Sequence, residues 1–203
     1  MSGGATIESV AVVGGGLMGT GIAESVATAG HHVVVRDVDE ASIEHARARI
    51  ETSLARAVRA GKLDSVTADQ VEGRIELTTE LHAIIDADLV IEAVPEQREL
   101  KLAVMNAIDS VVPEQTIVAS NTSSFPITEL ASSLRAPERV LGLHFFSPVP
   151  AMALVEIVVG LDTSQQTVAA ARQFAEGIGK QVIETKDRSG FIVNRLLVPY
   201  LMS

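Results

Sequence analysis

The stretch Val10-Ala-Val-Val-Gly-Gly-Gly-Leu-Met-Gly19 decides how this chain folds. It begins inside an apolar, β-branched run, which predicts a buried strand over Ile7–Val13. It continues with glycines at 14, 16 and 19, the spacing G-x-G-x-x-G, and then enters a predicted helix over 19–29 that ends at Gly30. A strand, a glycine turn and a helix in this order predict the first unit of a parallel α/β sheet.

The three spaced glycines have separate physical roles in a turn of this kind. Gly14 permits the tight turn, Gly16 lets a pyrophosphate approach the backbone, and Gly19 lets the helix pack close to the strand. Leu17 and Met18 lie directly before the predicted helix, at the end where unpaired N–H groups and the positive end of the helix dipole attract phosphate. We therefore predict a dinucleotide site whose contacts include all five of these residues.

An acidic residue follows the second predicted strand. This strand covers Val33–Arg36, and Asp37 comes 18 residues after Gly19. A carboxylate in this place accepts hydrogen bonds from ribose hydroxyls and repels a 2′-phosphate, which favours NAD over NADP. The neighbouring Arg36 weakens this preference slightly.

The rest of the chain alternates between short apolar runs and amphipathic segments. Thr67-Ala-Asp-Gln70 matches a capping box that would open a short helix. The alternation predicts a Rossmann-type, doubly wound and mostly parallel sheet over 7–188, after a flexible tail at 1–6. Further strands are predicted over 75–78, 88–94, 116–120, 140–146, 154–159 and 181–184, and helices over 41–60, 96–110, 126–134 and 164–178.

Composition excludes several classes of protein. The chain has 203 residues, 47% hydrophobic and 21% charged, which is enough apolar material for a core. Its net charge of −10 argues against a nucleic-acid partner. The absence of cysteine excludes disulfides and thiolate metal sites, and we expect no metal. No apolar run is long enough to span a membrane and the start does not look like a signal peptide, so we expect a cytoplasmic protein.

Four segments resemble the L-3-hydroxyacyl-CoA dehydrogenase family. They are Ser-Asn-Thr-Ser-Ser at 120–124, Gly-Leu-His-Phe-Phe-Ser-Pro-Val-Pro at 142–150, Leu-Val-Glu-Ile-Val at 154–158 and Gly-Phe-Ile-Val-Asn-Arg at 190–195. With the glycine turn, the resemblance covers essentially 7–203. It implies an NAD-binding domain followed by a helical domain, and oxidation of the 3-hydroxyl of an acyl-CoA thioester to a ketone in fatty acid metabolism.

The residues in these segments suit that reaction. Oxidation of a secondary alcohol by NAD requires a base, and histidine is the usual one at neutral pH. His144 ends a predicted strand at the sheet edge where ligands bind, and Glu156 on the next strand could orient its imidazole. The resemblance assigns the two residues as the catalytic dyad. The alternatives are a histidine satisfied by backbone groups and a surface-facing glutamate.

Four further residues match family positions that contact substrate or cofactor. By resemblance, Ser123 touches the substrate and the nicotinamide, and Asn194 lies on the substrate side. Ser123 could also cap the helix that begins near Pro126. Glu92 and Lys101 match positions that contact NAD, although Lys101 could equally be an exposed helix charge.

The substrate side of the chain matches the family less completely. Ser53 matches a CoA contact, whereas the family's lysine further along that helix has no counterpart. Arg56, Arg59 and Lys62 could supply positive charge to the CoA phosphates instead. Ser147 stands where many members carry asparagine, which puts the fine substrate preference in doubt.

The segment 189–203 is strongly apolar, and it predicts the start of a helical C-terminal domain that is otherwise absent. An exposed apolar stretch of this kind marks an interface, so we expect a homodimer that pairs through it, or fraying there. Two alternatives stay open. One is an NAD-binding fragment with little turnover, and the other is a sugar-acid dehydrogenase of the L-gulonate type.

Overall fold

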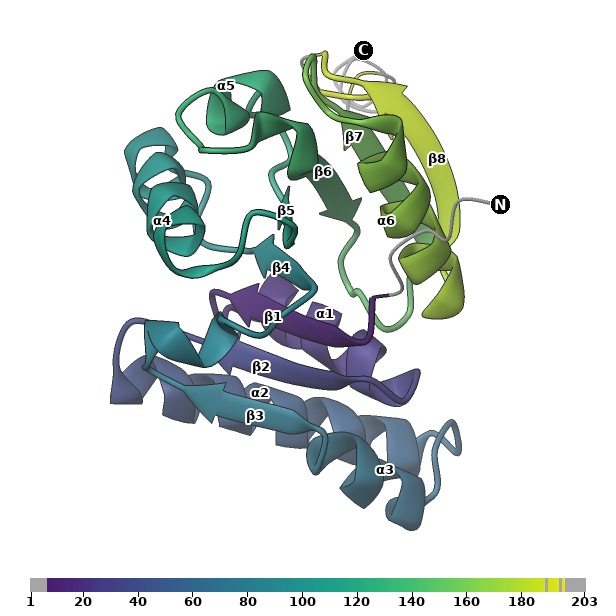
Figure 1. Cartoon of the computed structure of the whole chain (residues 1–203). Helices are drawn as coiled ribbons and strands as arrows, with labels where there is room; N and C mark the ends of the chain where they lie inside the picture. Colours follow the sequence, from purple (N-terminus) through teal and green to yellow (C-terminus); the bar gives the residue numbers. More distant parts are fainter. Residues whose placement is uncertain (1–6, 189, 194, 196–203) are drawn as a thin grey trace.

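One continuous sheet forms the centre of the domain. The computed structural model describes residues 7–188, 190–193 and 195, and within them eight strands run in the order β3-β2-β1-β4-β5-β6-β7-β8 (Figure 1). All neighbouring strands are parallel except β6 and β7, which are antiparallel. The strands are β1 Ser9–Val13, β2 His32–Arg36, β3 Ile75–Thr78, β4 Leu89–Glu92, β5 Ile117–Ser120, β6 Val140–Phe145, β7 Leu154–Val159 and β8 Gln181–Lys186.

Helices cover both faces of this sheet, as the continuous apolar strands require. Val10 and Val12 of β1 pack into a core shared with α1, α2, α3 and α6. Ala11 and Val13, which point to the other face, pack into a second core with α4 and α5. The helices are α1 Leu17–Thr28, α2 Glu40–Arg59, α3 Ser65–Glu72, α4 Arg98–Val111, α5 Ile127–Ala131 and α6 Gln165–Gly177.

The order of the strands places a crevice beside β1. The chain continues from β1 into α1 on one face and from the adjacent β4 into α4 on the other, so the loops after these strands diverge. Ligands of open α/β sheets bind at this kind of switch point, outside the carboxyl ends of the strands. Two backbone hydrogen bonds hold the loops in place there, from Gly14 N to Arg36 O at 2.8 Å and from Ala93 N to Val13 O at 2.8 Å.

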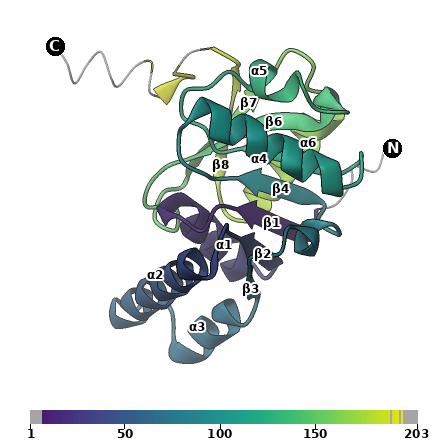
Figure 2. The ribbon, with the colours of Figure 1, turned by 90° about the vertical axis from the view of Figure 1, so that its left-hand side faces the viewer.

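The predicted Rossmann-type architecture is confirmed, and each observed strand coincides with a predicted apolar run to within two residues at either end. The capping box predicted at Thr67 is wrong. The helix begins earlier, and Asp64 caps it by accepting a hydrogen bond from Thr67 N at 2.8 Å. This helix, α3, lies beside α2 at one end of the molecule (Figure 2). Two short 3-10 helices, Leu81–Ile84 and Pro137–Arg139, were not predicted.

Several predictions concern residues that the structure does not describe. The tail at 1–6, Asn194 and most of the segment 189–203 fall in this group, and they stay predictions. Within the described residues, no helix combines the length and the apolar character needed to cross a membrane.

Candidate active site

The glycine turn after β1 has the shape that dinucleotide binding needs. Gly14 has a φ of 109°, and a Cβ there would lie 2.8 Å from the carbonyl carbon and oxygen of Ala93. A Cβ on Gly19 would lie 1.8 Å from the backbone oxygen of Gly14, so α1 packs against the turn only because this residue is glycine. A Cβ on Gly16 would meet nothing within 4 Å, which leaves space for a pyrophosphate at the uncapped start of α1.

Asp37 follows β2 and lies at the end of the cavity next to the glycine turn. Its Oδ2 accepts a hydrogen bond from Gly15 N at 2.6 Å, and its Oδ1 accepts one from Val38 N at 2.6 Å. Asp37 is therefore held by the turn itself while it lines the cavity. Arg36 also lines the cavity, with its Nε donating to Thr79 O at 3.2 Å.

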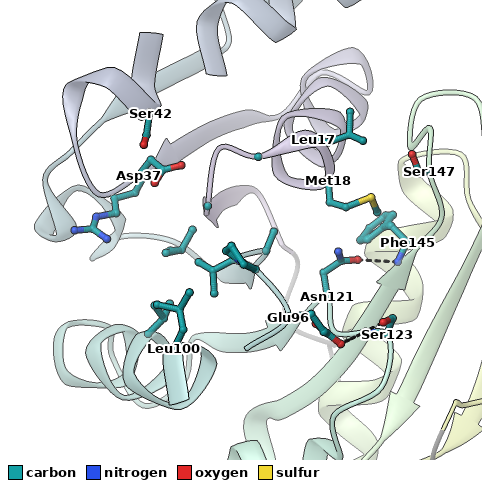
Figure 3. Close-up of a pocket in the computed structure, with 18 of the residues that line it drawn as sticks. Leu17, Met18, Asp37, Ser42, Glu96, Leu100, Asn121, Ser123, Phe145 and Ser147 are labelled. Atoms are coloured by element: carbon teal, nitrogen blue, oxygen red, sulfur yellow. Dashed lines mark hydrogen bonds between the residues drawn. The ribbon is translucent and has the colours of Figure 1, made fainter. Parts of the chain in front are cut away.

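A cavity of about 890 Å³ runs along the carboxyl ends of the strands from Asp37 to His144. Figure 3 shows Asp37 and Ser42 at one end of it, and Asn121 and Ser123 toward the other. Of the predicted contacts, Gly19 does not line this cavity, whereas six others do: Gly14, Gly16, Leu17, Met18, Asp37 and Ser123. With its open glycine, exposed helix N-terminus and terminal carboxylate, this lining fits an extended dinucleotide such as NAD.

His144 and Glu156 meet at the far end of the cavity. They are paired directly in the antiparallel register of β6 and β7, which puts both side chains on one face of the sheet. His144 Nδ1 lies 2.6 Å from Glu156 Oε2, and both side chains are buried. The ring of Phe146 lies 4.5 Å from the imidazole, centroid to centroid. Since Nδ1 is engaged by the carboxylate, Nε2 is the ring nitrogen left for a substrate in the cavity that His144 lines.

The other oxygen of Glu156 binds the backbone beyond β8. Its Oε1 accepts hydrogen bonds from Ile192 N at 3.0 Å and Val193 N at 2.9 Å. Burial alone would raise the pKa of Glu156, but the hydrogen bonds from His144 and from these two N–H groups outweigh it and lower the pKa below its usual value. Glu156 is therefore a carboxylate that is held ionised beside the imidazole.

Glu92 and Lys101, which are predicted to contact NAD, are both buried. Glu92 has no exposed surface and Lys101 is 1% exposed, and neither belongs to the cavity lining. Lys101 Nζ lies 2.8 Å from Glu92 Oε1, and Ser120 Oγ lies 2.5 Å from Glu92 Oε2. The alternative that Lys101 is an exposed helix charge is therefore wrong. Glu92 and Lys101 lie behind the cavity wall. Lys101 Nζ lies 3.2 Å from Oε2 of Glu96, and Glu96 does line the cavity.

Glu96 was not predicted, although it lines the cavity. Its Oε1 accepts hydrogen bonds from Thr122 Oγ1 at 2.6 Å and from the backbone N–H groups of Ser123 and Ser124 at 2.9 and 3.1 Å. One carboxylate therefore connects the loop after β4 with the loop after β5 (Figure 3). Ser123 does not cap α5, whose N-cap position is Pro126, and its hydroxyl lies 3.2 Å from Glu96 Oε1.

Comparison with known families agrees with this geometry. Residues 9–188 match the family described as 3-hydroxyacyl-CoA dehydrogenase, NAD binding domain. The chain belongs to this family. Its cofactor is therefore NAD, as the glycine turn and Asp37 predict.

Several similar proteins are named as hydroxyacyl-CoA dehydrogenases. The chain is 48% identical over 199 residues to a 3-hydroxybutyryl-CoA dehydrogenase of Mycobacterium tuberculosis, covering 97% of this chain and 70% of the relative. It is 40% identical to the mitochondrial hydroxyacyl-coenzyme A dehydrogenase of Homo sapiens, and the match covers 97% of this chain and 64% of that relative. The crystal structure of the (S)-3-hydroxybutyryl-CoA dehydrogenase PaaH1 of Ralstonia eutropha superposes with a TM-score of 0.94 at 40% identity. The match covers 97% of this chain and 69% of that structure.

A second cavity of this dehydrogenase domain, about 410 Å³, adjoins the first. Leu17 and Ser147 line both of them. Of the residues predicted to contact CoA, Ser53 and Arg56 line the second cavity, whereas Arg59 and Lys62 do not.

Three further residues that were not predicted also line the second cavity: His45 and Arg49 of α2, and Glu24 of α1. Burial raises the pKa of Glu24, opposed by a hydrogen bond from Ser53 and the charge of Arg56.

Lys180 holds the loop after β6, which contributes to the lining of both cavities. Its Nζ donates to Val149 O at 2.7 Å and Met152 O at 2.9 Å, and the side chain is only 8% exposed. Burial lowers its pKa. A second structural tie comes from Asn121, whose Oδ1 accepts a hydrogen bond from Phe145 N at 2.9 Å next to His144 (Figure 3). No sequence pattern around Lys180 indicates that it reaches this loop.

Proposed function

We propose that this chain catalyses the NAD-dependent interconversion of an L-3-hydroxyacyl-CoA and the corresponding 3-oxoacyl-CoA. The observation that carries the proposal is the His144–Glu156 pair in the wall of the dinucleotide cavity, with Nδ1 and Oε2 2.6 Å apart. When bound, NAD accepts the hydride that leaves the 3-carbon of the substrate.

His144 is the base in this proposal. With Nδ1 fixed by Glu156, its Nε2 takes the proton of the 3-hydroxyl, and the ionised carboxylate stabilises the imidazolium that forms. In the reverse direction the same nitrogen returns the proton to the 3-oxo oxygen. We assign Ser123 to the substrate oxygen and the nicotinamide end, since it lines the cavity together with His144. Asn194, matched by resemblance, contributes a further polar group on the substrate side.

The second cavity is proposed as the place of the CoA moiety. It opens beside the first across Leu17 and Ser147, so a thioester that reaches His144 can extend into it. Arg49 and Arg56 supply positive charge for phosphate, and Ser53 supplies a hydroxyl. A small sugar acid would have no use for this cavity, which favours an acyl-CoA over the sugar-acid alternative.

Two further assignments belong to the proposal. The apolar segment 189–203 is proposed to start a helical domain, and pairing of two chains through it would give a homodimer. A cytoplasmic location is proposed as well, from the composition described above.

The test is an assay with acetoacetyl-CoA and NADH, followed by the loss of NADH absorbance. We expect low turnover in the unmodified chain and, in a form that carries the helical domain, a decrease of about 10²–10⁴-fold in His144→Ala, the usual effect of removing a positioned base. His32→Ala is the matched control, because His32 is exposed and lines neither cavity. A chain that binds NADH without turnover is instead the binding-only fragment, and full turnover in His144→Ala contradicts the proposed mechanism.

A further inference from the structure

Glu96 is the charged side chain at the His144 end of the cofactor cavity. Among the residues that line the cavity, Arg36 and Asp37 carry charge at the opposite end, next to the glycine turn. Glu96 instead lies with Asn121 and Ser123, near Phe145 (Figure 3). If the proposed function holds, the nicotinamide ring has to lie near His144, and it therefore lies at the end of the cavity where Glu96 is.

The negative charge of Glu96 is built into the site. Its Oε1 accepts hydrogen bonds from the hydroxyl of Thr122 and from the N–H and hydroxyl groups of Ser123 and Ser124, and its Oε2 lies 3.2 Å from Lys101 Nζ. Burial alone would raise the pKa of Glu96, but the hydrogen bond from Thr122, the charge of Lys101 and the remaining hydrogen bonds lower it. A group with this many donors stays ionised at neutral pH.

Lys101 does not cancel this charge. It is shared between Glu96 and the fully buried Glu92, with Nζ 2.8 Å from Glu92 Oε1. Two carboxylates and one ammonium leave one net negative charge in the cluster. Glu92 is sealed from the cavity, whereas the side chain of Glu96 is 35% exposed toward it.

The two redox states of the cofactor differ at the end that meets this carboxylate. The nicotinamide ring is cationic in NAD⁺ and neutral in NADH, whereas the adenosine and pyrophosphate parts are the same in both. A fixed anion beside the ring attracts only the oxidised form, and a partly exposed charge pair of this kind changes affinity by about fivefold. We propose that Glu96 is a specificity-determining residue that favours the oxidised over the reduced cofactor.

Calorimetric titration of the full chain with NAD⁺ and with NADH tests this proposal. The quantity to compare is the ratio of the two dissociation constants, Kd for NAD⁺ divided by Kd for NADH. Glu96→Gln keeps an acceptor oxygen for the turn at 122–124 but removes the charge. We expect its ratio to rise about fivefold, through weaker binding of NAD⁺.

Two variants separate charge from position. Glu96→Asp keeps the charge and shortens the reach to the turn, so both affinities fall while the ratio stays within about twofold of the unmodified chain. Glu99→Gln removes the same charge from an exposed position in the first turn of α4 that does not line the cavity, and its ratio should not change.

The outcomes distinguish this proposal from the alternatives. An equal loss of both affinities in Glu96→Gln means that Glu96 only fastens the turn, and it overturns the proposal. A fivefold change of the ratio in Glu96→Asp, where the charge is kept, overturns it as well, and this arm decides the matter if thermal melting shows that the glutamine variant does not fold. The titrations need no turnover, so they stay informative even if the acetoacetyl-CoA assay shows no dehydrogenase activity.

Discussion

At the Asp37 end, the cavity is built from groups of a short stretch of chain, whereas the His144 end is built by side chains from four separate segments. The glycine turn and Asp37 lie within two consecutive strand-turn units and bind each other, through Gly15 N and Asp37 Oδ2. Glu96, Ser123, His144 and Glu156 follow or belong to four different strands. The first end depends on local backbone geometry, and the second depends on strand order and register.

The largest expected effect comes from a substitution in the glycine turn, at the end of the cavity that depends on local backbone geometry. In Gly19→Ala the new Cβ would lie 1.8 Å from Gly14 O, so α1 has to move away from the turn. We expect the free energy of unfolding to fall by about 3 kcal/mol, as for a severe overpacking of a core. Urea unfolding followed by circular dichroism measures this change.

Gly16→Ala is the matched control for that substitution. Its Cβ would meet nothing within 4 Å and its φ of −70° suits any residue, so stability should change little. NAD affinity should nevertheless fall, because the methyl group takes the space proposed for the pyrophosphate. Equal stability loss in the two alanine variants would show that the turn is not held by the Gly19 contact.

An intermediate effect sharpens the comparison at the adenosine end. Removing the carboxylate in Asp37→Ala deletes the acceptor for ribose hydroxyls, and we expect NAD affinity to fall by about tenfold. NADP affinity should fall less, because the charge that repels its 2′-phosphate is also lost. Titration with both cofactors gives the result, with the exposed Glu51→Ala on α2 as a charge-matched control. Equal affinity of the unmodified chain for NAD and NADP would contradict this role.

The smallest expected effect is a pH-dependent change in stability that comes from Glu156, at the His144 end of the cavity. The pKa of Glu156 is lowered in the folded state, so its contribution to stability is complete above its ordinary pKa of 4.5 and is lost as the pH falls through the lower, folded value. The stability difference between the unmodified chain and Glu156→Gln should therefore be larger at about pH 7 than at about pH 3. Urea unfolding at both pH values measures it, and a constant difference would mean that the charge of Glu156 adds nothing.

Much of the fold could be predicted because its central strands are buried on both faces. β4 and β6 are apolar apart from Glu92 and His144, and such runs are visible without any partner strand. The start of α3 was misplaced for a local reason. Thr67 and Asp64 are both good caps, and the residue that accepts the hydrogen bond is three positions earlier than the pattern suggested.

The dyad end of the site could be predicted only in part. His144 and Glu156 were found through family resemblance, and their pairing across β6 and β7 depends on a register that no local pattern encodes. Glu96 could have been found from its position directly after a buried strand, at the edge where ligands bind. Lys180 could not, because its contacts with Val149 and Met152 join segments about thirty residues apart.

The two oxygens of Glu156 have separate partners, and this division has a thermodynamic consequence. Oε2 binds the imidazole of His144, while Oε1 binds the N–H groups of Ile192 and Val193. These N–H groups contribute to the lowered pKa of the carboxylate, so drawing the backbone at 192–193 away would raise its proton affinity. By linkage, protonation of Glu156 and detachment of this segment promote each other. The charge that is proposed to stabilise the imidazolium thus depends on where the backbone at 192–193 lies.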